Sequence, residues 1–337
     1  MKTITKITLA IIGLTSASAH AIVGGTSVDE SLYQQYVTYT AGNQRCSGTI
    51  VGGKYILSAA HCMTNAKTGN IKDQRLIKFT TNPDDLLSRG FDIAIATIEE
   101  QYKTPTITFL SDLHVLDNER ADVFGWSTGV LKHAIMQTNS INQSIPQVLY
   151  LSDIGEGYTE RGDSGSPVLI NNNIISVHSG SSRTVDTPNE AEGSRIESSR
   201  DFILSTINDW HSPTELKFTG AQTIEIQSLH VNDTNLAERW NAADTLTTGD
   251  VTVTGGTCVT DMIAPFGTCT LDITAGAQSG AIKLTDDNIV TINRAAVVEP
   301  DTGGSTDKDN NNNGGGGGGS LGWLTLLALL PLAWRRK

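Results

Sequence analysis

The segment CSGTIVGGKYILSAAHC, residues 46–62, is the part of the chain that decides the fold. Two runs rich in apolar and β-branched residues flank a turn with two glycines, and a cysteine stands at each end. Such runs are typical of β-strands. Similar short runs recur as RLIKFT, DIAIATI, SPVLI and IISVH. Their number predicts an all-β barrel or sandwich for residues 22–213.

One segment of this first region departs from the strand pattern. In SRDFILSTINDW, residues 199–210, apolar residues recur with helical spacing after Ser199. A serine in front of such a run is a typical helix cap. We therefore expect a helix at the end of the first domain.

A second β-rich region covers residues 214–300, with strands expected in KFTGAQTIEIQSL, DVTVTG, CTLDIT and GAIKLT. Its cysteine pair and its CTLDIT strand resemble the immunoglobulin-like domains of bacterial surface proteins. The resemblance implies a small β-sandwich. Residues 301–320, DTGGSTDKDNNNNGGGGGGS, are polar and low in complexity, so we expect a flexible linker there.

Both ends of the chain have the composition of sorting segments. Residues 1–21 combine Lys2 and Lys6 with the apolar run ITLAIIGL and the small-residue stretch TSASAHA, as in a secretory signal peptide. Residues 321–337 contain fourteen mostly apolar residues and a basic end, RRK. Together with the preceding glycine run they resemble the GlyGly-CTERM sorting tail of Gram-negative secreted proteins. That resemblance implies a transient inner-membrane anchor that a rhomboid-type protease removes before release to the cell surface or medium. A permanent membrane anchor is the alternative.

Charge and cysteine content limit the partners and cofactors. The chain has a formal net charge of −12 and no long basic run, which excludes nucleic acid as a partner. An exported protein with four cysteines at local spacing is expected to form two disulfides, Cys46 with Cys62 and Cys258 with Cys269. Metal binding is the weaker alternative, because no CxxC pair or histidine cluster accompanies these cysteines. We expect no metal and no cofactor.

Four motifs in the first region fit one enzyme. IVGG begins at Ile22, SAAHC contains His61, DIAI contains Asp92, and GDSGSP contains Ser164. In this order they resemble the chymotrypsin-like and trypsin-like (S1) serine proteases over residues 22–210. The resemblance implies a chymotrypsin-like double β-barrel with a C-terminal helix, and a secreted serine endopeptidase that acts on proteins or peptides.

The resemblance assigns a role to each residue of a catalytic triad. Ser164 needs His61 to accept its hydroxyl proton, and Asp92 orients the imidazole and stabilises its protonated form. The backbone N–H groups of Gly162 and Ser164 would bind the oxyanion. The disulfide from Cys46 to Cys62 would fix the loop that carries His61. The alternative is a catalytically silent homologue that serves as a surface binding module.

An activation step is also implied. In this family the free amine of the IVGG terminus pairs with the aspartate before the nucleophile, here Ile22 with Asp163. Ala19, His20 and Ala21 form an A-x-A signal-peptidase site that ends directly before Ile22. Cleavage there would generate the activating terminus during export. Cleavage after Ala19 is the alternative, and it would leave a dipeptide to be removed.

The substrate pocket departs from the trypsin pattern. Tyr158 stands where a trypsin-like enzyme carries its carboxylate, so basic specificity is not expected. Glu160 stands where the family usually has a cysteine. Tyr158 could also favour small or apolar side chains by filling the base of the pocket.

The strand IISVHSGSS, residues 174–182, resembles the substrate-binding strand of glutamyl endopeptidases. In that alignment His178, Thr159 and Ser181 together bind a substrate carboxylate through charge-assisted hydrogen bonds. Ser179 belongs to the same part of the pocket. The alternative is that His178 points into the barrel or to solvent.

Overall fold

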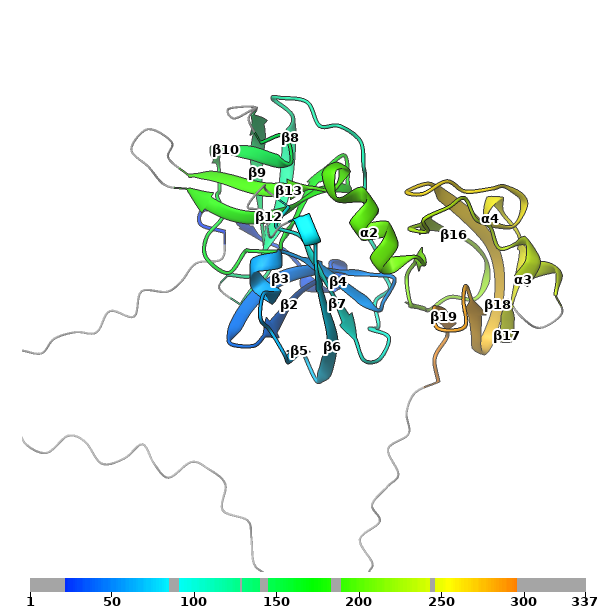
Figure 1. Ribbon diagram of the computed structural model, residues 1–337. Coiled ribbons are helices and arrows are strands. Elements are labelled where there is room, and N and C mark those ends of the chain that lie inside the picture. Colours follow the sequence, from blue (N-terminus) through cyan, green and yellow to red (C-terminus); the bar gives the residue numbers. More distant parts are fainter. Residues whose placement is uncertain are drawn as a thin grey trace, which may run out of the picture. The chain divides into compact units, whose positions relative to one another are not determined.

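Two β-barrels carry the four motifs (Figure 1). The computed structural model describes residues 22–84, 91–127, 129–139, 145–182, 189–242 and 246–295. The first barrel closes in the order β2-β3-β4-β7-β6-β5. Its strands are β2 (Tyr36–Ala41), β3 (Gln44–Val51), β4 (Tyr55–Ser58), β5 (Gly69–Ile71), β6 (Gln74–Thr81) and β7 (Ala94–Ile98).

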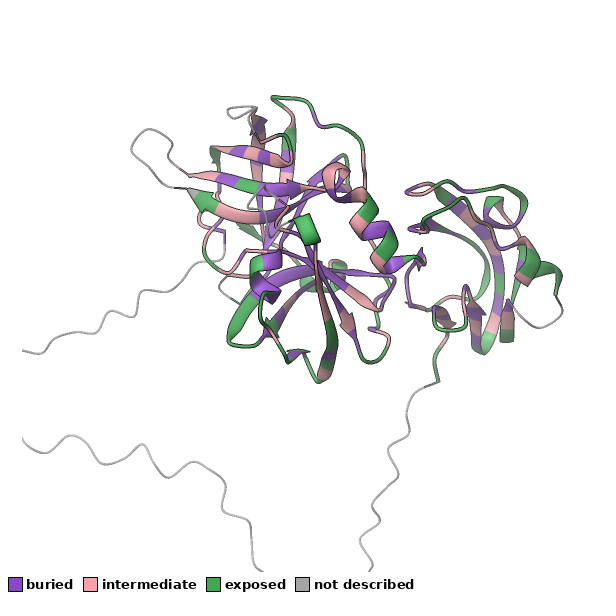
Figure 2. Ribbon diagram, viewed as in Figure 1, coloured by how far each residue is buried: buried purple, intermediate pink, exposed green. Residues whose placement is uncertain are grey.

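Residues 46–62 form the central hairpin of this barrel. β3 and β4 pair in antiparallel register, with Thr49 opposite Leu57. The apolar residues Ile50, Val51, Ile56 and Leu57 are all buried, and burial of such side chains is the main driving force for closing the barrel (Figure 2). A short helix, α1 (Ala60–Met63), follows at once and carries the histidine of the motif.

The second barrel closes through the order β9-β10-β13-β12-β11-β8, because β8 also pairs with β9. Its strands are β8 (Arg120–Gly125), β9 (Lys132–Asn139), β10 (Val148–Glu156), β11 (Pro167–Ile170), β12 (Asn173–Ser182) and β13 (Glu190–Arg195). The short β1 (Thr26–Ser27) adds to β9, and the 3₁₀ helix η1 (Glu30–Leu32) follows it. The predicted chymotrypsin-like double barrel is confirmed.

The predicted helix at 199–210 exists but is shorter. A 3₁₀ turn, η3 (Glu197–Ser199), leads into α2 (Arg200–Ile207), which buries Ile203, Leu204 and Ile207. The helix ends there because Asn208 adopts a left-handed conformation with φ 43°. The side chain of Ser199 does not cap the helix, so that part of the expectation is wrong.

The C-terminal region is β-rich, as predicted, and its strand pairings form one sheet in the order β14-β16-β18-β19-β15, with β17 also on β18. Its strands begin at β14, inside the segment predicted to be helical. The immunoglobulin-like assignment stays a prediction. The elements are β14 (Trp210–His211), β15 (Glu215–Leu216), β16 (Gly220–Ser228), α3 (Ala237–Asn241), β17 (Thr247–Gly255), α4 (Thr257–Thr260), β18 (Thr268–Lys283) and β19 (Ile289–Ile292).

Two buried side chains of this sheet bond to the barrels. The N–H of Gly52 donates to Nδ1 of His211, and Nε2 of His211 lies 3.0 Å from the carbonyl oxygen of Thr108. Gln227 accepts from the N–H of Leu110 and donates to its carbonyl, at 3.0 and 2.7 Å. Buried polar groups are costly unless paired, so these bonds make the junction specific.

The two predicted disulfides form, Cys46 with Cys62 and Cys258 with Cys269. The predicted signal peptide, linker and sorting helix lie outside the described residues. Of the helices in the described part of the chain, none is both long and apolar enough to cross a membrane.

Candidate active site

His61 is held by a carboxylate. It lies on α1, directly after β4, and Asp92 directly precedes the buried segment that becomes β7. Oδ1 of Asp92 accepts from the backbone N–H of His61 at 2.8 Å, and Oδ2 lies 2.6 Å from Nδ1 of the ring. The two contacts fix the orientation of the imidazole, and its Nε2 lies 3.7 Å from Sγ of Cys62. The His61 side chain is 44% exposed, so substrate can reach it.

Ser164 lies in the loop between β10 and β11, and it lines the same hollow as His61, which has a volume of about 700 Å³. The loop is fixed from behind by Ser47, which follows Cys46 on β3. The N–H of Ser47 donates to the carbonyl of Ser164 at 2.9 Å, and its hydroxyl donates to the carbonyl of Gly162 at 3.0 Å. The sequence did not suggest Ser47, although a hydroxyl residue in an otherwise apolar buried strand is a usable signal.

The glycines around Ser164 are required by conformation and space. Gly162 has φ 105° and Gly165 has φ 87°, values that side-chain-bearing residues rarely adopt. A Cβ on Gly165 would lie 2.1 Å from the carbonyl oxygen of Ser47.

In the part of the chain that the structure describes, no acceptor binds the backbone N–H of Gly162 or of Ser164. Both donors therefore remain available to a ligand.

Asp163 is fully buried beside Ile22. Its carboxylate accepts from the N–H groups of Ser127 and Glu160, each at 2.9 Å, and from the backbone N–H of Ile22. Burial raises the pKa of the Asp163 carboxyl, although these hydrogen bonds lower it. Ile22 is itself buried, and its neighbour Val23 pairs with Tyr158 through two backbone hydrogen bonds. The structure thus brings Ile22 and Asp163 together.

A second hollow, of about 360 Å³, also has Ser164 in its wall. Thr159, His178 and Ser181 all line it, as the alignment predicts, together with Glu160, Arg161 and Gly180. Oγ1 of Thr159 and Oγ of Ser181 lie 2.6 Å apart. The three predicted carboxylate-binding side chains are therefore close to the nucleophile.

His178 is buried, with an exposed fraction of 1%. Its Nδ1 has no hydrogen-bond partner among the residues that the structure describes. Burial, and secondarily the nearby His61, lower the pKa of His178 to about 4. The ring is therefore neutral at pH 7, and its buried Nδ1 is left unsatisfied within the described residues.

Two residues expected in the pocket do not line it. Tyr158 packs against the core of the second barrel, together with Ile22, and not at the base of the hollow. Ser179 is directed to Ser194, with 3.4 Å between the hydroxyl oxygens. Neighbouring residues of an extended chain point to opposite faces, so Thr159 takes the pocket side and Tyr158 does not. In β12 a β-bulge between His178 and Gly180 interrupts this alternation, and Ser181 lines the pocket together with His178 while Ser179 does not.

The disulfide lies against His61. Potential metal-ligand atoms of Cys46, His61 and Cys62, namely the two sulfurs and one ring nitrogen, lie within 4.8 Å of one another. Because the two sulfurs are joined, they offer no thiolate to a metal.

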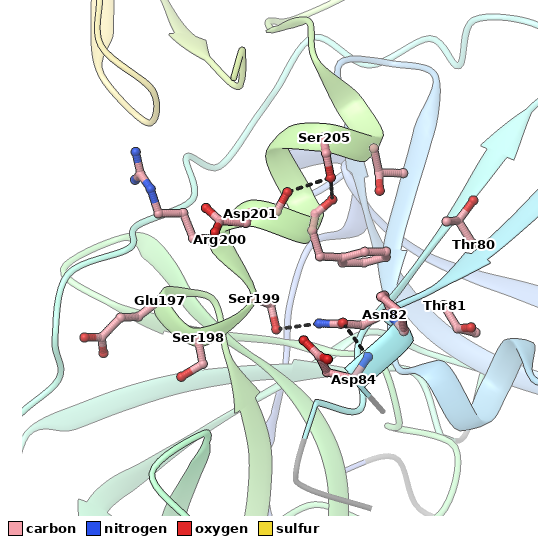
Figure 3. A pocket seen from close by; sticks show the side chains of 13 residues that line it. Thr80, Thr81, Asn82, Asp84, Glu197, Ser198, Ser199, Arg200, Asp201 and Ser205 are labelled. Atoms are coloured by element: carbon pink, nitrogen blue, oxygen red, sulfur yellow. Dashed lines mark hydrogen bonds between the residues drawn. The ribbon is translucent and has the colours of Figure 1, made fainter. Parts of the chain in front are cut away.

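A third hollow, of about 580 Å³, contains none of the predicted site residues (Figure 3). It lies between the end of β6 and the start of α2. Nδ2 of Asn82 lies 3.5 Å from Oγ of Ser199, and Oδ1 of Asn82 accepts from the N–H of Asp84 at 3.1 Å. Ser205 donates to the carbonyl of Asp201. These polar groups largely bond to one another.

The chain is similar to known peptidases. A family model described as Trypsin matches residues 22–203, just over half of the chain. An uncharacterized peptidase of Corynebacterium glutamicum (strain R) is 25% identical over 188 residues, which cover 52% of this chain and 65% of that protein. The chain thus spans less than two thirds of that relative's length. A trypsin of Saccharopolyspora erythraea is 22% identical over 223 residues, 56% of this chain and 98% of that protein.

Two solved structures are also similar. An inactivated protease paralogue of the scabies mite is 16% identical, with a TM-score of 0.49, over 55% of this chain and 97% of that one. A mutant of human heparin binding protein is 17% identical, with a TM-score of 0.49, over 56% of this chain and 97% of that one. The family match, on the double barrel described above, decides the assignment: the chain belongs to the trypsin family of serine peptidases.

Proposed function

We propose that the protein is a serine endopeptidase that uses Ser164, His61 and Asp92. The observation that carries the proposal is the double contact of Asp92 with His61, at the hollow that Ser164 also lines. A carboxylate bonded to Nδ1 selects the tautomer in which Nε2 can accept a proton. Membership of a peptidase family makes proteins or peptides the substrates.

The chemistry follows from these positions. His61 Nε2 takes the hydroxyl proton of Ser164 as Oγ bonds to the substrate carbonyl carbon, and the carbonyl oxygen becomes an oxyanion. The N–H groups of Gly162 and Ser164 bind that oxyanion. His61 then gives the proton to the leaving amine, the C–N bond breaks, and an acyl-enzyme remains. Water, activated by His61, hydrolyses the ester and restores Ser164.

Activation is proposed to follow removal of residues 1–21. Ile22 is buried with its backbone nitrogen at the Asp163 carboxylate, so a new α-ammonium there would pair with a buried anion. Signal peptidase would generate this terminus during export. Export would take place in a Gram-negative bacterium. A rhomboid-type protease and the secretion machinery would then act on the C-terminal tail.

Specificity for an acidic side chain is the finer proposal. Thr159, His178 and Ser181 supply two hydroxyls and an imidazole to one pocket, and Nδ1 of His178 has no partner among the described residues. A substrate carboxylate would satisfy these groups and raise the pKa of His178.

The decisive experiment is covalent labelling with a peptidyl phosphonate. We expect the mature protein to be labelled at Ser164, the Ser164→Ala variant to remain unlabelled, and the matched Ser198→Ala variant to be labelled normally. An intact wild type that takes no label would support the alternative of a silent homologue that only binds.

Specificity and activation have separate tests. Peptides that differ only at the cleaved residue should show Glu cleaved faster than Gln and much faster than Arg. Preferred cleavage after Arg or Lys would overturn the acidic pocket.

Mass spectrometry of the exported protein should find Ile22 at the N-terminus, whereas a terminus at His20 would contradict direct activation.

A further inference from the structure

The hollow shared by His61 and Ser164 has an unusual charge for this chain. The protein carries a formal net charge of −12, yet two arginines, Arg45 and Arg161, line this hollow. Among the described residues of its wall there is no aspartate or glutamate. The local charge is thus opposite in sign to that of the whole protein.

These two arginines are also not ion-paired within the described part of the chain. Five other arginines do have carboxylate partners: Arg75 with Glu99, Arg120 with Glu156, Arg200 with Asp112, Arg239 with Asp286 and Arg294 with Glu215. Arg45 is anchored through Nε, which donates to Thr38 at 3.1 Å. Its terminal nitrogens, like those of Arg161, remain for another acceptor.

The position of His61 tells which part of a substrate enters this hollow. In the proposed mechanism His61 gives its proton to the leaving amine, so that amine must lie against the imidazole. The pocket with His178, which Ser164 and Arg161 also line, takes the side chain of the acyl half in that mechanism. The residues that follow the cleaved bond therefore extend along the wall formed by Arg45, Cys46 and His61.

We propose that Arg45 and Arg161 give the enzyme a preference for acidic residues at the two positions after the cleaved bond. This inference rests on the proposed peptidase function and extends it to the leaving-group side. Both arginines are exposed, so each should contribute modestly, about two- to fivefold in kcat/KM, as exposed ion pairs do.

Quenched fluorescent peptides with one acyl half and three leaving halves test the proposal. The two residues after the cleaved bond would be Asp-Glu, Ser-Gln or Lys-Lys. We expect kcat/KM for the acidic peptide to exceed that of the neutral one by about tenfold in 0.1 M salt. The advantage should shrink in about 1 M salt, where the Debye length falls from roughly 10 to 3 Å.

Variants assign the preference to residues. Arg45→Gln and Arg161→Gln should each lower the acidic-to-neutral ratio, and the double variant should lower it most. Arg75→Gln is the matched control, because Arg75 is exposed on the same barrel but does not line the hollow. Its ratio should equal that of the wild type.

Two outcomes would count against the idea, and they differ. Equal cleavage of the acidic and neutral peptides, or a preference unaffected by both substitutions, overturns the role of the arginines while the peptidase function stands. Failure to cleave any peptide, together with failure of phosphonate labelling, overturns the peptidase function itself. Active-site titration of each variant keeps altered folding from being mistaken for altered specificity.

Discussion

His61 and His178 border the two hollows that meet at Ser164, and they are held in opposite ways. The side chain of His61 is 44% exposed and is bonded twice to Asp92. His178 is 1% exposed, its Nδ1 lacks a partner in the described structure, and its pKa is lowered to about 4.

The difference fits the two proposed roles. His61 must gain and lose a proton at each turnover, whereas His178 becomes charged only when an anionic substrate binds. A catalytic base has to become an imidazolium and revert at each turnover, so a carboxylate next to it is useful. An imidazole that only binds is neutral when the pocket is empty, and an incoming anion makes its charged form favourable. The predictions below test this contrast, first at Asp92 and then at the buried ring.

The largest effect is expected from Asp92→Asn. The amide would stabilise the wrong imidazole tautomer, and a comparable substitution lowers kcat by about 10⁴. Steady-state kinetics with a neutral peptide should show the loss mainly in kcat, with little change in KM. Asp84→Asn, near the same barrel but away from the two hollows at Ser164, should leave kcat unchanged. A loss below tenfold would show that Asp92 does not orient the base.

The next effect is on stability and concerns His178. Its folded-state pKa of about 4 lies below the ordinary value of 6.5, so between these two pH values the unfolded chain binds a proton that the native protein does not. The free energy of unfolding should therefore fall as the pH drops from about 6.5 to 4. The shift corresponds to about 3 kcal/mol for this one group.

Urea unfolding of the wild type and of His178→Gln at pH 7.5 and pH 4.5 would measure this contribution. The variant should lose less stability on acidification. His211→Gln should behave in the same way, because burial lowers the pKa of His211 to about 4 as well. Identical pH slopes in all three proteins would show that these rings are protonated in the folded state.

Much of the fold was predictable because its signals are local. Short runs of apolar and β-branched residues identify strands, and the paired cysteines at 46 and 62 lie where the hairpin meets α1. The end of α2 was not predictable from spacing, since it depends on the left-handed conformation of Asn208. Trp210 also continued the helical pattern, but it pairs with β16, a contact distant in sequence.

The candidate site also has a part that local motifs predict and a part that they do not. The motifs identify His61, Asp92 and Ser164, which the fold brings to one region, while their catalytic roles stay predictions. The pocket depends on which face of each extended segment is inward. The prediction was wrong for the orientation of Tyr158, because that depends on the bridge between Val23 and Tyr158, which no local pattern reveals.

A smaller effect is expected on specificity. If His178 meets a substrate carboxylate, His178→Gln should reduce the preference for Glu over Gln by about 10- to 100-fold, the range for a hydrogen bond to a charged group. Ser179→Ala is the matched control, because Ser179 is adjacent but outside the pocket wall. A Glu preference that survives His178→Gln would assign recognition to other groups.

The smallest effect is expected from Ser47→Ala, which tests the support behind the catalytic loop. The variant keeps the N–H bond to the Ser164 carbonyl but loses the hydroxyl bond to the Gly162 carbonyl. One neutral hydrogen bond contributes about 1 kcal/mol, so kcat should fall about fivefold. If Ser47 positions the oxyanion donors, the affinity for a peptidyl boronate should fall by the same factor while the affinity for a substrate-like product stays constant. Ser205→Ala, on the exposed face of α2, should change neither affinity. Equal weakening of boronate and product binding would instead mean that Ser47 supports the barrel in general and has no specific part in placing the Gly162 N–H.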